Sequence, residues 1–515
     1  MQSGHLSRRE GIGFGVAILA LLVLALVRLE TYPAPWFDEG WYLQVPRNLA
    51  LFGEYATLST EGFRHDDTVL SVSPTLYVPI ALVFKSVGIG LIQARLVAVA
   101  YLLAAVAAVY LFARQLYGRT VAAGAAYLLV FHMEADPFTS TLLLGRQVMG
   151  EVPALAFALL GCVAWRQGVV RRRPARAAVA GVLFGLATIT KLQYALLLPT
   201  GLGLVTLLAW RRRQTAELMA AVVAAVVSVA TLGAWCLCLW SVLGTEHARE
   251  LLANVASASG PQVRVISLVA VGHAVKFLAT STFLLTGVPA LVYAVMRARG
   301  EDHHDPGETL LLSVIVVCLG WFVLRSIGWP RYAYPFLALT NILTARLIVD
   351  LGGLATRNGI ATARGAAAAL LLLALPMGQL PRVAAALLAQ PDHSARDLYH
   401  WIDDTLPAGA RIETWEYEVA FMDTTRQYHL PPVQFVERMI ARVNLGVVDA
   451  LPYDFERFQP GYLVIGRFAK WTALYPPTFL EQQSRKVATF GGADLNRRAG
   501  IIGPCPRRPS SSCTH

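Results

Sequence analysis

Apolar runs near the length of a lipid bilayer recur along most of this 515-residue chain, from residue 11 to about residue 388. A helix needs roughly 20 apolar residues to cross the hydrocarbon core of a membrane. Charged residues make up only 15% of the chain, against roughly a quarter in ordinary soluble domains. The sequence therefore predicts an all-α polytopic membrane bundle.

Hydropathy predicts about eleven transmembrane helices in this bundle. We expect them at residues 11–29, 92–113, 119–134, 148–165, 176–190, 193–210, 216–243, 266–296, 308–325, 332–349 and 364–388. The run at 74–88 is short for a span and contains two prolines. It is therefore expected to form a re-entrant or juxtamembrane segment on the outer face.

The formal net charge of +11 follows the predicted topology. Arginine clusters stand between the apolar runs, and the positive-inside rule assigns such clusters to the cytoplasm. With an odd number of crossings, the N-terminus is then cytoplasmic and the C-terminal part is extracytoplasmic. The sequence thus predicts a multi-pass protein of the cell membrane, in contact with membrane lipids, and no nucleic-acid partner.

Composition divides the chain into three parts. Residues 1–391 are expected to form the transmembrane domain, with a long first outer loop at 30–91. Residues 392–500 contain the helical pattern ARDLYHWIDDTLP and the strand-like stretches ARIETW, GYLVIG and RKVATFGG, which predict a small α/β domain. The Pro/Ser-rich residues 501–515 are expected to be disordered.

Two adjacent carboxylates follow the first span, in the stretch WFDEGWYL at residues 36–43. A short amphipathic helix is expected after Asp38 and Glu39, ending near Gly53. In one interpretation Asp38 caps this helix by accepting a backbone N–H. In the other it takes a proton from an acceptor hydroxyl or amine, a role in which placement counts more than a large pKa shift.

Cationic and aromatic residues recur where the outer ends of helices are predicted. A guanidinium can donate two parallel hydrogen bonds to phosphate oxygens. The alternative for any one cation is an interfacial side chain that reaches toward lipid head groups. The positive-inside rule disfavours positive charge on the outer side of the membrane. Cations that are predicted there therefore indicate a bound phosphate. The candidate residues are Arg146 and Glu151 in GRQVMGEVPAL, Lys191 in TKLQYALLLP, Arg331 and Tyr332 in PRYAYPF, and His65 in GFRHDD.

Together these stretches resemble the GT-C superfamily of integral membrane glycosyltransferases, in particular its branch of protein O-mannosyltransferases and lipid A aminoarabinose transferases. The matching pieces are the first span, FDEGWY in a long first loop, SPTLYVPIALVFKSVG, GRQVMGEVPAL, TKLQYALLLP and PRYAYPF. They cover most of residues 11–350. The resemblance implies transfer of a hexose or pentose from a polyprenyl-phosphate donor to a protein, lipid or glycan acceptor of the cell envelope, on the outer face of the membrane.

The resemblance also implies roles for particular residues. The key acid of the first loop maps to Asp38, with Glu39 beside it. The second acidic position, at the start of the fourth span, maps to Glu151. The Arg-Tyr pair near the tenth span maps to Arg331 and Tyr332.

The expected mechanism is a single in-line displacement at the anomeric carbon, with inversion of configuration. Asp38 would deprotonate or orient the acceptor, and Arg331, Lys191 and Arg146 would neutralise the leaving phosphate. Some relatives carry a lysine before the paired prolines of the first loop, where this chain has Ser73. Phosphate contact is therefore expected from the other cations.

The sequence contains no P-loop or Rossmann fingerprint, which fits a lipid-linked donor. No cofactor is required by this reaction. Mg²⁺ or Mn²⁺ is compatible with the available carboxylates, although no spacing specifies a metal site. These carboxylates are Asp38, Glu39, Asp66, Asp67 and Glu151.

Two other functions are weighed against the transferase. A transporter or flippase of lipid-linked sugars would place ionisable groups or broken helices near the bilayer midplane. The acids and bases of this chain instead gather at predicted helix ends, which favours surface chemistry. A non-catalytic assembly factor of the cell envelope would leave the outer cations without a role.

Overall fold

The computed structural model describes residues 8–65, 74–264, 266–300, 305–357 and 392–445, with parts of 366–388 and 453–498. The chain divides into two compact units, each assembled from segments that are far apart in the sequence. Unit 1 comprises residues 1–29, 69–80 and 94–389, and unit 2 comprises residues 30–68, 81–93 and 390–515. The division falls within α3 (Pro74–Val87) and near the start of α4 (Leu91–Tyr117).

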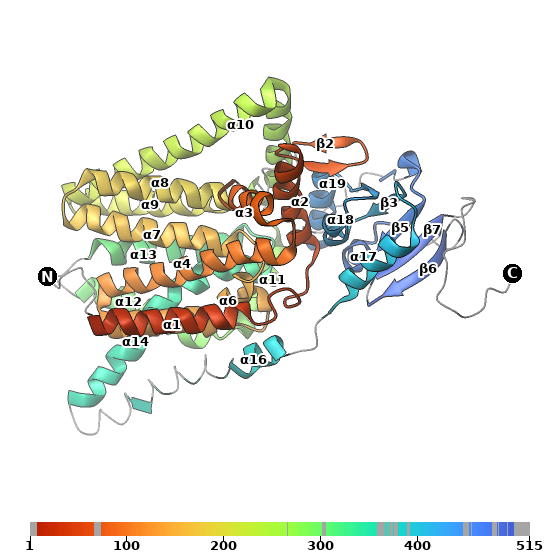
Figure 1. Ribbon diagram of the computed structural model, residues 1–515. Coiled ribbons are helices and arrows are strands. Elements are labelled where there is room, and N and C mark those ends of the chain that lie inside the picture. Colours follow the sequence, from red (N-terminus) through yellow and green to blue (C-terminus); the bar gives the residue numbers. More distant parts are fainter. Residues whose placement is uncertain are drawn as a thin grey trace. The chain divides into compact units, whose positions relative to one another are not determined.

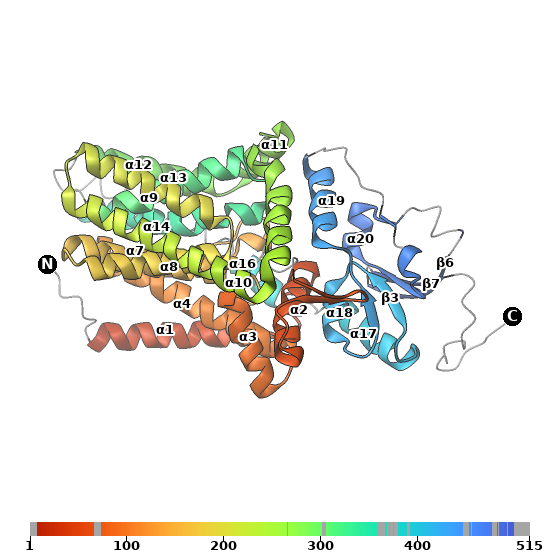
Figure 2. The same cartoon turned by 90° about the horizontal axis from the view of Figure 1, so that it is seen from above.

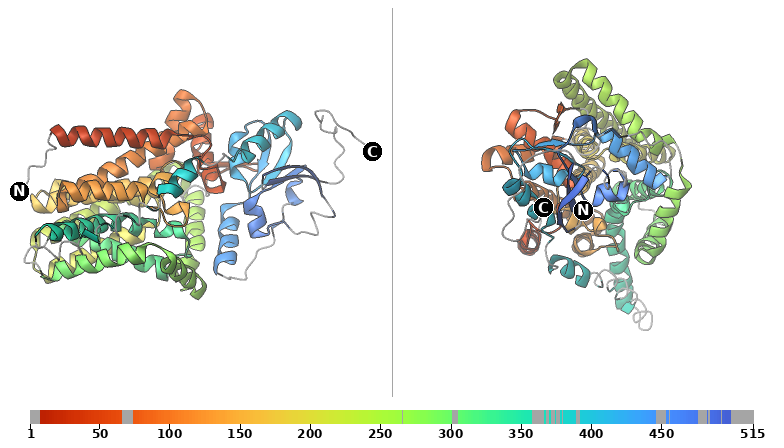
Figure 3. Two further views of the ribbon diagram at one scale, coloured as in Figure 1. Left: turned by 90° about the horizontal axis from the view of Figure 1, so that it is seen from below. Right: turned by 90° about the vertical axis from the view of Figure 1, so that its right-hand side faces the viewer.

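Unit 1 is a helical bundle in which most long helices run side by side (Figure 1). Besides α4 it contains α1 (Arg8–Leu26), α5 (Arg119–Phe131), α6 (Thr141–Leu144), α7 (Glu151–Val170), α8 (Pro174–Thr190), α9 (Tyr194–Arg211), α10 (Thr215–Arg264), α11 (Leu268–Thr280), α12 (Phe283–Gly300), α13 (Pro306–Leu324), α14 (Tyr334–Arg357) and α16 (Leu380–Leu388), with the 3-10 helices η2 (Pro137–Thr139) and η3 (Pro330–Ala333). Figure 3 shows α1 at the edge of this bundle.

Close backbone contact holds α8 against α10. Gly181 makes this contact, since a Cβ atom there would lie 2.6 Å from the carbonyl oxygen of Ala224. Small residues at helix crossings let backbones approach, which gains the van der Waals contacts that hold helices together in a membrane.

Five helical segments of the described chain are long and apolar enough to cross a membrane. They are Leu91–Tyr117, Glu151–Val170, Thr215–Arg249, Pro306–Leu324 and Pro330–Gly353. Four shorter apolar helices, of 10–17 residues, accompany them. The polytopic helical fold is thus confirmed, whereas the count of eleven spans is not.

The predicted span at 266–296 is wrong as a single helix. Its residues form α11 and α12, which are bent by 89° at a break after Thr280. With this bent pair as one crossing, the candidate spans number up to six. Part of the predicted span at 364–388 lies outside the described residues, and its last residues form α16. The tail at 501–515, Ser73, Asp66 and Asp67 also lie outside the described residues.

Unit 2 contains a five-stranded mixed sheet in the order β4-β3-β5-β7-β6. β3 pairs in parallel with β4 and with β5, and β7 is antiparallel to β5 and β6. The predicted strands are found as β3 (Arg411–Thr414), β5 (Tyr462–Ile465) and β6 (Ser484–Phe490), and the predicted helix as α17 (Ser394–Thr405). The other elements are β4 (Gln427–His429), β7 (Ala493–Arg498), α18 (Tyr417–Met422), α19 (Val433–Leu445), α20 (Arg467–Thr472) and η4 (Glu456–Phe458).

The helices cover both faces of this sheet, with α17 and α18 on one side and α19 and α20 on the other (Figure 2). The chain moves from β3 to β4 through α18 and returns past β3 to β5 through α19. Parallel crossovers are right-handed, so two crossovers in opposite directions place their helices on opposite faces.

The first-loop segment packs in unit 2, whereas its sequence predicts a loop of the transmembrane domain. It forms α2 (Phe37–Phe52) and the hairpin β1 (Thr57–Ser59) and β2 (Gly62–Arg64). The guanidinium of Arg47 on α2 donates to the carbonyl oxygens of Ala420, Phe421 and Asp423, at the C-terminal end of α18. Because those carbonyls have no partner within the helix, Arg47 supplies one.

A buried histidine joins the hairpin to the sheet. His429 at the end of β4 is 2% exposed, and its imidazole pairs with Glu413 of β3 and, at 2.8 Å between Nε2 and Oε1, with Glu61. Burial lowers the pKa of His429, but the two carboxylates outweigh it and raise the pKa overall. Burial raises the pKa of Glu61, but hydrogen bonds from His429 and Ser59 outweigh it and hold this pKa at about 2.

Hairpin docking is therefore expected to be strongest at intermediate pH. The Glu61 contribution is complete above the ordinary glutamate pKa and is lost as the pH falls toward about 2. The His429 contribution is complete below the ordinary histidine pKa and is lost as the pH rises through the raised value. Hydrogen exchange of residues 57–64, followed as a function of pH, measures the strength of hairpin docking. An unchanged profile at acidic pH in Glu61→Gln would contradict the expected contribution of Glu61.

Candidate functional site

A buried ion pair stands at the start of α7. Glu151 is the first residue of this helix, and its carboxylate lies 2.9 Å from the ammonium group of Lys191, which follows α8. Glu151 is 1% exposed and Lys191 is 7% exposed. Two sequence motifs that are 40 residues apart, GRQVMGEVPAL and TKLQYALLLP, thus meet at one place.

Arg331 belongs to the same cluster, since its guanidinium interacts electrostatically with Glu151. It lies in η3, directly before α14, and is largely buried. Its Cζ atom is 5.1 Å from the ring centroid of Trp329 and 5.4 Å from that of Tyr332. The two stacked rings fix the direction of the guanidinium, because the faces of aromatic rings attract cations.

The SPTLYVP stretch also reaches this end of the bundle. The hydroxyl of Thr75, in α3, is 2.7 Å from that of Thr190, the residue before Lys191. Tyr101 of α4 donates to the carbonyl oxygen of Thr75 at 2.5 Å. These contacts tie α3 and α4 to the last turn of α8, where Lys191 is held.

Arg146 is engaged elsewhere. Its side chain is fully buried, and its guanidinium donates to the carbonyl oxygens of Leu24 and Val27, at the C-terminal end of α1. Carbonyls at a helix end need such partners. This geometry favours a structural role over the predicted contact with phosphate, which stays a prediction.

A second polar cluster, at the break between α11 and α12, was not anticipated from the sequence. Glu134 accepts hydrogen bonds from the backbone N–H and the hydroxyl of Thr282, both at 2.8 Å. His132 lies 3.2 Å from Glu134 and 2.9 Å from the side-chain oxygen of Asn341 on α14. The cluster supplies partners to the helix that begins after the break.

In unit 2, the structure excludes the capping interpretation of Asp38. The helix α2 begins at Phe37 with Trp36 in the N-cap position, so Asp38 and Glu39 both lie in the first helical turn. Asp38 is 7% exposed and Glu39 is fully buried. Carboxylates in this turn are stabilised by the positive end of the helix dipole. The predicted helix end is confirmed at Gly53.

The other residues of FDEGWY hold this turn in place. Gly40 packs directly on α18, and a Cβ atom there would lie only 2.1 Å from the backbone nitrogen of Glu418. The ring of Phe37 stacks on Phe468 with 4.0 Å between centroids and meets the edge of Tyr417 at 5.1 Å. The motif therefore combines two acids with the residues that bury and orient their backbone.

Two further carboxyl groups lie beside this turn, Glu416 and Glu418, and no sequence motif marks them. Burial raises the pKa of Glu418 far above its ordinary value, and the nearby charges of Glu416 and Glu39 raise it further. Burial also raises the pKa of Glu416, although backbone N–H groups near the start of α20 oppose this.

His65 lies in unit 2, apart from these acids. Its Nδ1 atom is 3.3 Å from the carbonyl oxygen of Tyr55, and its Nε2 atom is 3.7 Å from Glu54. Its part in phosphate binding stays a prediction.

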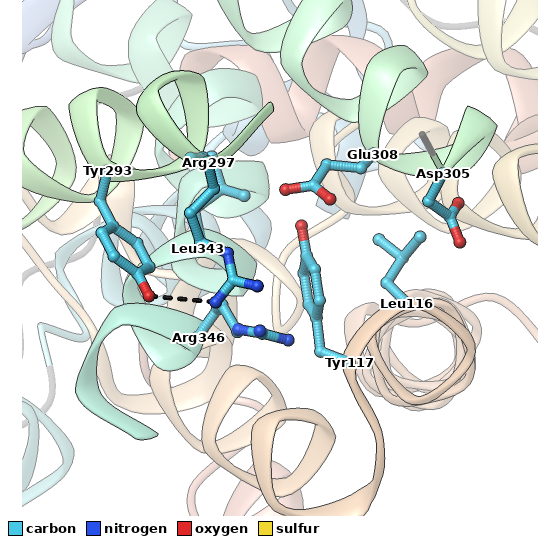
Figure 4. A pocket seen from close by; sticks show the side chains of 9 residues that line it. Leu116, Tyr117, Tyr293, Arg297, Asp305, Glu308, Leu343 and Arg346 are labelled. Atoms are coloured by element: carbon cyan, nitrogen blue, oxygen red, sulfur yellow. Dashed lines mark hydrogen bonds between the residues drawn. The ribbon is translucent and has the colours of Figure 1, made fainter. Parts of the chain in front are cut away.

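A third polar cluster occupies the opposite end of unit 1. Arg166, about 22 Å along α7 from Glu151, pairs with Asp305 before α13. Arg297 and Arg346 both pair with Asp350 of α14, at 3.1 and 2.5 Å. They line a cavity of about 170 Å³, where the hydroxyl of Tyr117 points toward Glu308 (Figure 4). These charges satisfy one another and tie the helix ends together.

Unit 2 holds a larger cavity, of about 850 Å³. Apolar side chains of α2, α3 and α18 form much of its lining, among them Leu51, Phe84 and Phe421. Lys85 and Arg396 add positive charge, and Arg396 pairs with Glu30 at 3.5 Å. This volume falls in the range of small-ligand sites.

No group of three or more histidine, cysteine, aspartate or glutamate side chains is arranged to hold a metal ion within the described part of the chain. Two of the carboxylates considered as ligands, Asp66 and Asp67, lie outside that part. A divalent cation at Asp38, Glu39 or Glu151 stays a prediction.

Comparisons with known proteins show which family model and which solved structures this chain resembles. The model of the dolichyl-phosphate-mannose-protein mannosyltransferase family matches residues 71–240, which include Glu151 and Lys191. A comparison with curated proteins finds no match.

Solved structures of other proteins share the fold. ArnT from Cupriavidus metallidurans bound to undecaprenyl phosphate has a TM-score of 0.64 and 16% sequence identity, over 96% of this chain and 99% of that chain. The Archaeoglobus fulgidus oligosaccharyltransferase in its apo form has a TM-score of 0.57 and 15% identity, over 89% of this chain and 70% of that chain. The family match and the shared fold confirm the resemblance of this chain to the GT-C superfamily of integral membrane glycosyltransferases.

Proposed function

We propose that this protein is a membrane glycosyltransferase that takes its sugar from a polyprenyl-phosphate-linked donor. The observation that carries the proposal is the buried cluster of Glu151, Lys191 and Arg331 at the end of a span-length helix. Burying charged groups in a membrane protein is costly, so such a cluster marks a functional site. The family match and the fold support the transferase class.

In this proposal Lys191 and Arg331 bind the phosphate of the donor, and Asp38 takes the proton from the acceptor hydroxyl or amine. The bond between the anomeric carbon and the phosphate oxygen breaks as the acceptor forms its bond on the opposite face, which inverts configuration. The two cations neutralise the charge that develops on the leaving phosphate. Glu151 holds Lys191 in position at 2.9 Å.

We place the reaction on the outer face of the cell membrane, with the N-terminus in the cytoplasm, on the basis of the arginine distribution. The acceptor is a protein, lipid or glycan. ArnT was solved with undecaprenyl phosphate and the related oligosaccharyltransferase AglB with an inhibitory peptide and dolichol-phosphate, which supports a lipid-linked donor.

The test is sugar transfer in proteoliposomes that contain the purified protein, with polyprenyl-phosphate sugars as donors and mass spectrometry of the products. Transfer that requires the protein and yields free polyprenyl phosphate supports the proposal, and the anomeric configuration of the product tests inversion. The absence of transfer with every hexose and pentose donor, from folded protein, would contradict it.

Replacing Arg331 with Ala is expected to weaken donor binding by about 10- to 100-fold, because a hydrogen bond to a charged group contributes roughly 1.5–3 kcal/mol. Arg331→Lys keeps the charge but loses the planar fork, so it should recover only part of the affinity. The matched control is Arg346→Ala, in the middle of α14 and part of the polar cluster at the opposite end of unit 1, which should leave donor affinity unchanged. Titration with polyprenyl phosphate measures both, and equal losses would contradict a role for Arg331 in binding.

A transporter of lipid-linked sugars is the second candidate, and the broken helix α11–α12 is the observation that favours it. However, Thr282 at the break is hydrogen-bonded to Glu134 and His132, which follow the end of α5. The neighbouring Asp136 interacts with Arg331, so the break belongs to the end of the bundle that holds the ion cluster. Movement of labelled donor across proteoliposomes without any acceptor would favour transport.

A further inference from the structure

The cavity of about 850 Å³ is lined by residues of unit 2 alone. Phe84 of α3 and Phe421 of α18 form part of its wall, and their rings stack with 6.1 Å between centroids. These two side chains are 3% and 4% exposed, whereas Leu51 of α2, on the same lining, is 48% exposed. The cavity therefore runs from the surface to a buried apolar wall.

The lining also includes the start of a membrane span. Residues 88–91 line the cavity, and Leu91 is the first residue of α4, a candidate span of 27 residues. At 1.5 Å per residue α4 is about 40 Å long, whereas the hydrocarbon core of a bilayer is roughly 30 Å thick. The ends of α4 therefore reach the head-group layers, and the cavity beside Leu91 is expected at the surface of the membrane.

The carboxylates of the lining are compensated within the protein. Glu30 pairs with Arg396 at 3.5 Å, and Asp392 pairs with Arg467 at 3.2 Å. Three of the other titratable side chains of the lining add no negative charge, since they are His393, His400 and Tyr399. The described lining therefore holds no uncompensated carboxylate that would repel an anion.

Lys85 supplies a further positive charge to this lining. It lies in the last turn of α3, directly after Phe84, and its side chain is exposed. Within the described part of the chain no carboxylate pairs with it. A cation at the opening of an apolar cavity suits a ligand that joins an apolar chain to an anionic head.

We propose that the cavity binds an anionic phospholipid of the surrounding membrane, with an acyl chain against Phe84 and Phe421 and the phosphate at Lys85. Exposed residues next to the lining are apolar as well, since Phe52 is 55% exposed and Val87 is 69% exposed. Exposed apolar patches mark contact surfaces. Beside the end of a span, the molecules that contact such a surface are lipids.

This site is separate from the donor site proposed above. Glu151, Lys191 and Arg331 belong to unit 1, whereas every residue of the described lining belongs to unit 2. A lipid bound here would stabilise the packing of α2, α3 and α18, which all contribute to the cavity. The alternative for Lys85 is an interfacial side chain that reaches toward head groups and uses no cavity. The two differ in whether an acyl chain reaches the buried rings.

The test uses phosphatidylglycerol with a photoreactive group in one acyl chain, reconstituted with the full-length protein in lipid nanodiscs. We expect labelling of Phe84 and Phe421. Unlabelled phosphatidylglycerol should compete about fivefold better than phosphatidylcholine, the factor that one lysine near the membrane surface adds to the binding of an anionic lipid. Equal competition by both lipids would overturn the proposal. So would the absence of labelling at both rings, which would leave the cavity to a protein or glycan ligand.

The charge is tested by Lys85→Gln, which should remove the preference for phosphatidylglycerol. The matched control is Arg485→Gln, an exposed cation of β6 that is not part of the described lining. It should keep the preference of the wild type. If the two variants behave alike, Lys85 does not select the head group and the proposal is overturned.

The cavity itself is tested by Ala50→Trp, which fills it from α2 and keeps Lys85. Labelling of Phe421 should be lost while the thermal unfolding midpoint stays near that of the wild type. Unchanged labelling would place the lipid outside the cavity and overturn the proposal. Thr424→Trp, at an exposed residue of the lining, gives the same comparison if Ala50→Trp does not fold. None of these measurements requires sugar transfer, so their outcome is independent of the proposed function.

Discussion

Replacing Asp38 with Asn is expected to lower kcat for sugar transfer by about 10²- to 10⁴-fold, the usual contribution of a general base. The amide has the shape of the carboxylate but cannot accept the proton of the acceptor. Because Asp38 lies in a helical turn held by Phe37 and Gly40, the substitution should leave α2 folded. Donor affinity should also be little changed, since Lys191 and Arg331 bind the phosphate in this mechanism.

The matched control is Glu39→Gln, the neighbouring acid on the same turn. It should cost less in kcat than Asp38→Asn, because Glu39 is fully buried against α18 and acts through its neighbours. Kinetics with saturating donor, on protein of equal thermal stability, measure the difference. Undiminished transfer by Asp38→Asn would remove this residue from the mechanism.

Replacing Lys191 with Met is expected to destabilise unit 1 by about 3–5 kcal/mol, because it leaves the buried carboxylate of Glu151 without its ion-pair partner. Thermal unfolding in detergent measures the loss. Transfer should be lost as well, but this variant alone cannot separate folding from phosphate binding.

The double variant Lys191→Met with Glu151→Leu separates them. Apolar replacement of both members of a buried ion pair is often neutral for stability, so this protein should recover most of its thermal stability. It should nevertheless transfer no sugar, because it lacks the ammonium group that neutralises the leaving phosphate. Recovery of activity together with stability would make the pair purely structural.

Much of the fold could be predicted from hydropathy and from the order of the motifs. Apolar runs placed the helices of unit 1, and the alternation in GYLVIG and the spacing in ARDLYHWIDDTLP placed β5 and α17. The break between α11 and α12 was not predicted because hydropathy does not depend on the direction of the helix axis. Residues 266–296 are apolar on both sides of the break. The polar groups that satisfy the break, Glu134 and His132, come from a different part of the chain.

The candidate site was predictable where charged residues recur in motifs. Glu151, Lys191 and Arg331 were singled out separately, and the structure brings them together. In the sequence Arg146 is a candidate phosphate ligand like Lys191 and Arg331. In the structure its partners are carbonyl groups of α1, which no local sequence pattern reveals. Glu418 was missed because only the folded chain brings its backbone against Gly40, in the turn that carries Asp38 and Glu39.

The composition of unit 2 has a consequence for synthesis of the protein. The carbonyl of Ala420 that accepts from Arg47 lies 373 residues later in the chain, which a ribosome reaches only after roughly 20–70 seconds. Until then the helix with Asp38 lacks the surface on which Phe37 and Gly40 pack. Chains that stop before α18 and α20 would therefore enter the membrane with an unfinished proton acceptor.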